Sequence, residues 1–152
     1  MSTPSPRETF NSDYEYLKNF WIMSEFGIDS SDYELFHAFF SSGKCPQTKE
    51  EKDHYDSLPK MFTVYRGYDS ITGNWNGFAW TPEKECAEFF AKRSSFFNEA
   101  RRREGAVIDA SKPMIVTMQS GKGNIDAVLL GRETEFIICE PDEDMIITNI
   151  EV

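Results

Sequence analysis

The sequence predicts an α+β fold, and three observations support this class. Three helix-capping patterns precede Pro59, so the first part of the chain is expected to be helical. After Pro59, short apolar runs alternate with turn residues, as is typical of antiparallel strands. A helix start at Thr81-Pro82-Glu83 interrupts these strands, because it combines an N-cap hydroxyl, a proline at the first helical position and an acid in the first turn.

Each capping pattern pairs a hydroxyl with a glutamate three residues later: Ser12 with Glu15, Ser31 with Glu34, and Thr48 with Glu51. The first helix carries an apolar stripe formed by Phe10, Tyr14, Leu17 and Trp21. The second helix carries Tyr33, Phe36 and Phe40 and is expected to end at Ser42-Gly43. The third is polar and ends before Pro59. We expect these aromatic side chains to pack in the core.

The expected strands cover residues 61–66, 77–80, 106–108, 114–118, 125–130, 135–139 and 145–152. The embedded helix would run from Thr81 towards Arg101 and turn four side chains inward: Cys86, Phe89, Phe90 and Phe97. The segment 120–124 is interpreted as a hairpin turn that bears Lys122, because the full phosphate-loop pattern is absent.

Length and composition indicate one domain with a substantial core, since the chain has 152 residues of which 39% are hydrophobic. We expect a flexible tail over residues 1–9 and a single domain over 10–152, helical in 10–58 and mostly β in 59–152. No apolar run approaches the roughly 18 residues that span a bilayer, and the start MSTPSPRE lacks a signal-peptide layout. Three widely spaced cysteines do not suggest a disulfide framework, so a cytoplasmic location is expected.

The charge is negative and unevenly distributed. The formal net charge is −10, and residues 126–152 contain eight acids but only one basic residue, Arg132. This argues against extended binding to nucleic acid, although a local basic groove for one nucleotide stays open. The triplet Arg101-Arg102-Arg103 is either a solvated helix end or a site for a cofactor phosphate or an acidic partner. No metal is expected, because the histidines and cysteines lack metal-ligand spacing.

Three places could carry chemistry, and the first is Arg66. By strand alternation Arg66 shares a face with Phe62 and Val64. Gly67 follows and would let backbone or ligand approach closely. An arginine in this position either pairs with a structural carboxylate or binds an anion through its planar fork.

The second place is the junction from Gly77 to Pro82, where the free amides of the following helix could face a ligand. The third is GRETEFII, residues 131–138, in which Glu133 and Glu135 would project from one strand face about 7 Å apart. Like charges at that spacing repel. They are either solvated or suited to a site where positive charge develops during a reaction.

Taken in order, VYRGY, GFAWTPEKECAEFFAKR and GRETEFII resemble the arginine–serine–glutamate branch of the ADP-ribosyltransferase superfamily, over about residues 61–138. The resemblance implies a split β-sandwich with an N-terminal helical segment and a cleft that binds NAD. Arg66 would hold the cofactor's phosphate or ribose. Glu135 would bind the nicotinamide ribose and favour an oxocarbenium-like transition state. Glu133 would orient or deprotonate the acceptor.

The resemblance also implies further cofactor contacts, at Gly67, Ala79, Trp80, Thr81 and Phe89. Trp80 and either Phe89 or Phe90 would stack on adenine or nicotinamide, unless they pack in the core. Ala79 departs from the family pattern, which places there a serine that helps to fix the catalytic glutamate. Only Thr81 keeps a hydroxyl, and capping of the helix can occupy it.

The implied activity is mono-ADP-ribosylation of a protein acceptor, with an arginine side chain favoured by Glu133, and with release of nicotinamide. By analogy, the compact chain suggests a bacterial or phage effector that acts on host proteins. Two alternatives stay open. The cleft could bind a nucleotide or a protein partner without chemistry, or the enzyme could modify a small molecule or a nucleic-acid base.

Overall fold

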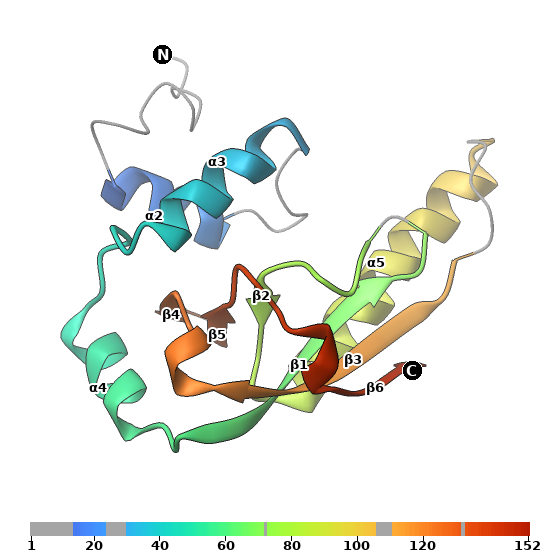
Figure 1. The fold of residues 1–152 in the computed structure, drawn as a ribbon. Helices are drawn as coiled ribbons and strands as arrows, with labels where there is room; N and C mark the ends of the chain where they lie inside the picture. The colour runs from blue at the N-terminus through green and yellow to red at the C-terminus, as the bar shows by residue number, and fades with distance from the viewer. Residues whose placement is uncertain (1–13, 24–29, 72, 106–110, 132) are drawn as a thin grey trace, which may run out of the picture.

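The computed structural model describes residues 14–23, 30–71, 73–105, 111–131 and 133–152. Within these residues the fold is α+β, with four α-helices, two small antiparallel sheets and no closed barrel (Figure 1). The predicted fold class is therefore confirmed at this level. The expected tail over residues 1–9 lies outside the described residues.

The helices are α2 (Tyr14–Met23), α3 (Ser30–Ser41), α4 (Lys49–Ser57) and α5 (Lys84–Arg103). The capping box before α4 is present as predicted: Glu51 N donates to Thr48 Oγ1 at 3.1 Å and Thr48 N to Glu51 Oε1 at 2.9 Å. Gly43 ends α3 with φ of +75°, as expected of a glycine after a helix. The predicted cap at Ser12 and the stripe residue Phe10 lie outside the described residues.

The first sheet has the strand order β1-β3-β6, from β1 (Met61–Asp69), β3 (Pro113–Gly121) and β6 (Ile146–Glu151). The second has the order β2-β5-β4, from β2 (Ala79–Trp80), β5 (Thr134–Ile137) and β4 (Ala127–Leu130). Two short 3₁₀ turns, Lys122–Asn124 and Glu143–Met145, precede β4 and β6. The expected strands are thus confirmed to within a few residues, except 106–108, which lies outside the described part of the chain.

The segment around Lys122 is not the predicted hairpin turn. The strands that it joins, β3 and β4, belong to different sheets, and β4 pairs instead with β5. The segment is therefore a crossover between the sheets, anchored where Lys122 Nζ donates to Asp56 O at 3.1 Å.

The helix start at Thr81 lies later than predicted. Thr81 still has strand geometry, because its backbone exchanges hydrogen bonds of 2.7 and 2.9 Å with Tyr65 and so links the two sheets. The first carbonyl that accepts helical bonds is that of Glu83, bonded by Cys86 N at 3.1 Å. The Thr81 hydroxyl accepts from Glu83 N at 3.1 Å, so it stabilises the turn that leads into α5.

Helix α5 turns a different face inward from the one predicted. Phe89 is 61% exposed and Phe90 37% exposed, whereas Ala87 and Ala91 are buried. The reason is the close contact of α5 with β1 at Gly67, where an added Cβ would lie 1.9 Å from the Ala87 carbonyl oxygen. Only small side chains fit between backbones this close. The side chain of Phe97 is not among those described.

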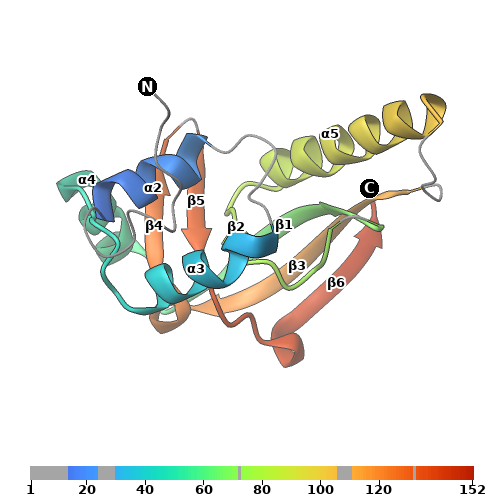
Figure 2. The ribbon, with the colours of Figure 1, turned by 90° about the horizontal axis from the view of Figure 1, so that it is seen from above.

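Two apolar clusters make up the core. One joins α2 and α3 to the second sheet through residues such as Leu17, Phe36, Phe40 and Ile137. The other lies between the sheets, with Val64 and Val116 from the first sheet and Trp80, Val128 and Phe136 from the second. Helices α2 and α3 therefore cover the second sheet, the second sheet packs on the first, and α5 runs along β1 and β3 of the first sheet (Figures 1 and 2).

A buried ion pair joins α2 to α4 and to the edge of the second sheet. Lys18 Nζ lies 2.5 Å from Glu51 Oε1 and 2.6 Å from Pro46 O. Glu51 Oε2 accepts from Leu130 N of β4 at 3.0 Å, and Gln47 Oε1 accepts from Val128 N at 2.8 Å. Burial raises the pKa of Glu51, but its hydrogen bonds from Lys18, Thr48 N and Leu130 N outweigh burial, and the net shift of the pKa is downward.

None of the described helices is both long enough and apolar enough to cross a lipid bilayer.

Replacing Lys18 by methionine should lower the free energy of unfolding by about 3 kcal/mol at pH 7, because removal of one partner leaves the other charge buried and uncompensated. Urea denaturation measures this loss. The loss should shrink in acid, since the depressed pKa of Glu51 means that its stabilisation is lost as pH falls through the folded-state value.

The matched control is Lys49→Met, because Lys49 forms an exposed pair with Asp53 at 3.9 Å. That change should cost no more than about 0.5 kcal/mol. Equal losses in the two variants would contradict the structural role of the buried pair.

Candidate active site

Arg66 is held by backbone carbonyl oxygens. Its Nε donates to Asn74 O at 3.1 Å and its Nη1 to Ala79 O at 3.2 Å. Among the described residues it forms no ion pair, so the predicted pairing with a structural carboxylate is not observed. Burial lowers the pKa of Arg66, while the nearby Tyr33 and Glu135 act in the opposite direction.

Gly77 provides the space that the guanidinium occupies. An added Cβ at Gly77 would lie 2.0 Å from Arg66 Nη2 and 2.2 Å from Cζ. Gly77 is itself buried, at the start of the segment that leads into β2. The junction 77–82 therefore contributes a glycine and a carbonyl oxygen to the site, and these two groups fix the arginine fork.

Glu135 lies on β5, opposite Leu129 of β4. Its Oε1 accepts a hydrogen bond from the indole Nε1 of Trp21 at 2.8 Å. The pKa of Glu135 is raised to about 7: burial and then the neighbouring Glu133 raise it, against the Trp21 hydrogen bond and the positive charge of Arg66. Glu135 and Arg66 therefore act on each other electrostatically, without a direct ion pair.

Glu133 directly precedes β5 and lies beside the first turn of α5. Cys86 of that turn contacts Glu83, with Sγ 3.1 Å from Oε2. The pKa of Cys86 is raised to about 12 by burial together with the hydrogen bonds of the thiol to Glu83 and Glu133. The thiol is therefore protonated at neutral pH and can donate to a carboxylate.

Two of the predicted cofactor contacts, Trp80 and Gly67, are engaged in packing. Trp80 is 1% exposed, lies in the cluster between the sheets and donates its Nε1 proton to Gly77 O at 2.8 Å, so its ring has no free face for a ligand. Its core-packing alternative is correct. Gly67 alternates with Arg66 along β1 and faces α5, so its small size serves the contact with Ala87.

The other predicted contacts lie as follows. Ala79 accepts the Arg66 bond through its carbonyl oxygen. Thr81 is buried, and its hydroxyl is occupied by Glu83 N. Phe89 is exposed, with its ring centroid 6.0 Å from that of Phe90, and three residues along α5 from Cys86. Phe89 and Cys86 therefore lie on one face of α5.

Sequence reasoning missed the contribution of the N-terminal helices. Trp21 and Tyr33 were expected only to pack in the core. Trp21 instead bonds Glu135, and Tyr33 lies near enough to Arg66 for the guanidinium to act on the pKa of its hydroxyl. Burial raises the pKa of Tyr33, and Arg66 opposes this. One general rule could have pointed to such a contact, although not to its partner: a buried indole N–H requires a hydrogen-bond acceptor.

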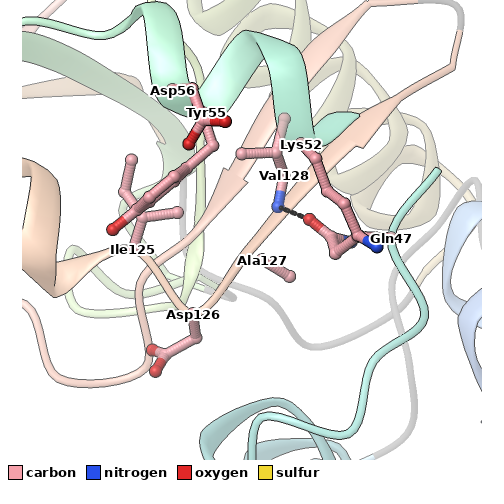
Figure 3. Close-up of a pocket in the computed structure, with 8 residues that line it drawn as sticks. All are labelled: Gln47, Lys52, Tyr55, Asp56, Ile125, Asp126, Ala127 and Val128. Atoms are coloured by element: carbon pink, nitrogen blue, oxygen red, sulfur yellow. Dashed lines mark hydrogen bonds between the residues drawn. The ribbon is translucent and has the colours of Figure 1, made fainter. Parts of the chain in front are cut away.

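A separate pocket of about 350 Å³ lies between α4 and the strand β4 (Figure 3). Its lining consists of Gln47, Lys52, Tyr55, Asp56, Ile125, Asp126, Ala127 and Val128. Among the described residues, no hydrogen bond or ion pair joins this lining to Arg66 or Glu135, and the Gln47 side chain is engaged with Val128 N. The pocket is thus distinct from the predicted site. In the described residues, no group of three His, Cys, Asp or Glu side chains could hold a metal ion.

The arrangement can stabilise a cation. Two carboxyl groups lie close together, one of them partly buried with a pKa near neutrality, and a guanidinium is fixed nearby. A buried carboxylate interacts strongly with positive charge that develops beside it, because water does not screen the interaction. A carboxyl group with a pKa near 7 is also suited to general acid–base catalysis.

Replacing Glu135 by glutamine should raise the free energy of unfolding by about 2 kcal/mol at pH 8. The folded-state pKa of about 7 lies above the ordinary 4.5, so the folded protein holds the proton more tightly and loses stability as pH rises between these values. Glutamine cannot ionise and still accepts from Trp21. Urea denaturation at pH 5 and pH 8 tests this; a wild type that is the more stable protein at pH 8 would contradict the burial of an ionisable Glu135.

Gly77→Ala should destabilise the protein by about 1–3 kcal/mol by displacing the Arg66 guanidinium. In an Arg66→Ala background the same change should be nearly neutral, because the clashing atoms are gone. Denaturation of the four proteins of this cycle gives the coupling. Gly123→Ala, where nothing lies within 4 Å of the added atom, is the control. Additive effects would show that Arg66 does not lie against Gly77.

Comparison of the chain with models of known protein families, with curated proteins and with solved structures gives no significant match.

Proposed function

We propose that the protein is a mono-ADP-ribosyltransferase that moves ADP-ribose from NAD to a protein acceptor. The observation that carries the proposal is the interaction of Arg66 with Glu135, with Glu133 beside Glu135. These residues come from the first and third motifs of the resemblance, and the second motif supplies the carbonyl of Ala79 that holds Arg66. Two antiparallel sheets with a core between them are compatible with the split β-sandwich that we propose as the detailed fold.

In the proposed reaction, the bond between the nicotinamide nitrogen and the ribose C1 breaks, and nicotinamide leaves with the bonding electrons. The ribose becomes cationic, and the Glu135 carboxylate stabilises this charge. The acceptor nitrogen forms the new bond to C1 and loses its proton to Glu133. A guanidinium has five N–H groups, and two of those of Arg66 are used by carbonyl oxygens. The structure shows no hydrogen bond from the other three to a described residue, and we assign them to a phosphate of NAD.

The proposed acceptor is an arginine side chain. The carboxylates of Glu133 and Glu83 both lie beside Cys86 at the start of α5, so a cationic side chain would be attracted there. By analogy we further propose an effector of bacterial or phage origin that acts in the cytoplasm of a host cell.

A second candidate is a binding module on the same fold. Two observations favour it: Ala79 replaces the serine of the resembled family, and the pKa of Glu135 of about 7 leaves much of this group protonated at neutral pH. A protonated carboxyl cannot stabilise a ribosyl cation. A third candidate keeps the chemistry but transfers ADP-ribose to a small molecule or a nucleic-acid base.

Glu135→Gln should reduce release of nicotinamide from labelled NAD by about two to three decades, because it removes the charge that stabilises the transition state. Glu133→Gln should reduce label transfer to protein in a cell lysate more than it reduces NAD hydrolysis, because Glu133 is assigned to the acceptor. Both products are measured in the same reaction.

Equal loss of the two activities in Glu133→Gln would contradict the division of roles. Free nicotinamide without labelled protein would favour water or a small acceptor. A thermal shift with NAD but no turnover by the wild type would favour the binding module.

A further inference from the structure

We propose that Trp21 is a positioning residue for Glu135, so that helix α2 forms part of the site. The hydrogen bond between the indole Nε1 and Glu135 Oε1 is 2.8 Å long. Among the described residues Trp21 is the only side-chain donor to this carboxyl group. The catalytic consequence of this role rests on the function proposed above, whereas the fixing of the carboxyl group does not.

The direction of the indole N–H is fixed by packing on several sides. The Trp21 ring stacks on Phe78 with centroids 4.9 Å apart and planes 20° apart. Phe40 meets it edge-on at 5.2 Å, and Phe36 lies at 5.4 Å. An aromatic ring held in this way loses little further freedom when it donates a hydrogen bond, so it can hold a carboxyl group in one orientation.

Strand β2 offers no hydroxyl donor for this purpose. Ala79 pairs with Ile137, and Glu135 lies on the same face of β5 as Ile137, so position 79 faces the side of the sheet where Glu135 lies. Alanine has no donor there. The hydroxyl of Thr81 is engaged with Glu83 N. The indole thus takes over the role of fixing Glu135, which the resembled family gives to a serine at position 79.

The bond to Trp21 also bears on the ionisation of Glu135. A donor that points at the carboxyl oxygen favours the charged form, as does the positive charge of Arg66 on β1. Burial and the negative charge of Glu133 favour the neutral form. Tyr33 of α3 acts on Arg66 rather than on Glu135 directly. Removing the indole N–H therefore shifts the balance towards the neutral acid.

The direct test needs no substrate. In a pH titration of the ¹⁵N-labelled protein, the indole N–H resonance of Trp21 should move with a midpoint near pH 7, as Glu135 ionises. Trp80 is the internal control, because its Nε1 donates at the same 2.8 Å to the carbonyl of Gly77, which does not titrate. Glu135→Gln should abolish the movement at Trp21. A flat Trp21 signal from pH 5 to pH 9, or an unchanged titration in Glu135→Gln, overturns the proposal.

The second test uses Trp21→Phe, which keeps a ring in the cluster but removes the donor. Its kcat for nicotinamide release should fall by about 10- to 100-fold, as expected for loss of a hydrogen bond to a charged group. The KM for NAD should change little, and the pH midpoint of kcat should rise. Adding Ala79→Ser should restore part of the rate, because it returns a hydroxyl to the same face.

Trp75→Phe is the matched control, since Trp75 belongs to the cluster between the sheets and its loss should leave the pH midpoint unchanged. An unshifted Trp80 resonance in Trp21→Phe shows that the variant is folded. A folded Trp21→Phe variant with the wild-type kcat and pH midpoint overturns the positioning role. A wild type without NAD turnover would instead contradict the proposed function, and the Trp21 titration would then decide this proposal alone.

Discussion

The partial burial of the Glu135 carboxyl group is the constraint that connects the parts of this molecule. A buried carboxyl group is costly unless it is partnered. Two groups from other parts of the chain favour its charge, an indole from α2 and a guanidinium from β1, whereas the carboxyl group of Glu133 just before β5 opposes it. Helix α2, the first sheet and the second sheet must therefore all be folded before Glu135 has these neighbours. The layered order of the fold is what brings them together.

The same burial creates a conflict between the stability of the folded protein and the proposed chemistry. Burial that raises the pKa of Glu135 makes its ionised form unfavourable for the folded state. The ionised form is nevertheless the one that can stabilise a cation. Arg66 and Trp21 reduce this conflict, because both favour the charge. Arg66 forms no direct ion pair with Glu135 among the described residues, so the carboxylate can still interact with the positive charge of a substrate.

The fold class, the capping box at Thr48 and the helix end at Gly43 were predictable, because local hydrogen bonding and backbone geometry determine them. The hairpin at 120–124 was predicted wrongly because the pairing partner of β4 is decided by distant residues. The inward face of α5 was predicted wrongly because hydrophobicity favoured its phenylalanines, whereas the approach of Gly67 to Ala87 requires small side chains. Strand alternation predicted which neighbours share a strand face with Arg66 and with Glu135. No local sequence pattern links Trp21 to residue 135, because the two are far apart in the chain.

The side chains that cover the edge of β4 have a further consequence. Gln47 and Glu51 accept from Val128 N and Leu130 N, which would otherwise be open to a strand from another molecule. Glu51 does so as a carboxylate that is also bonded to Lys18. Protonation of Glu51 in acid would weaken its bonds to Leu130 N and to Lys18, and would loosen α4 from the sheet. Acidic solution is therefore where we expect intermolecular strand addition, and aggregation, to begin at this edge.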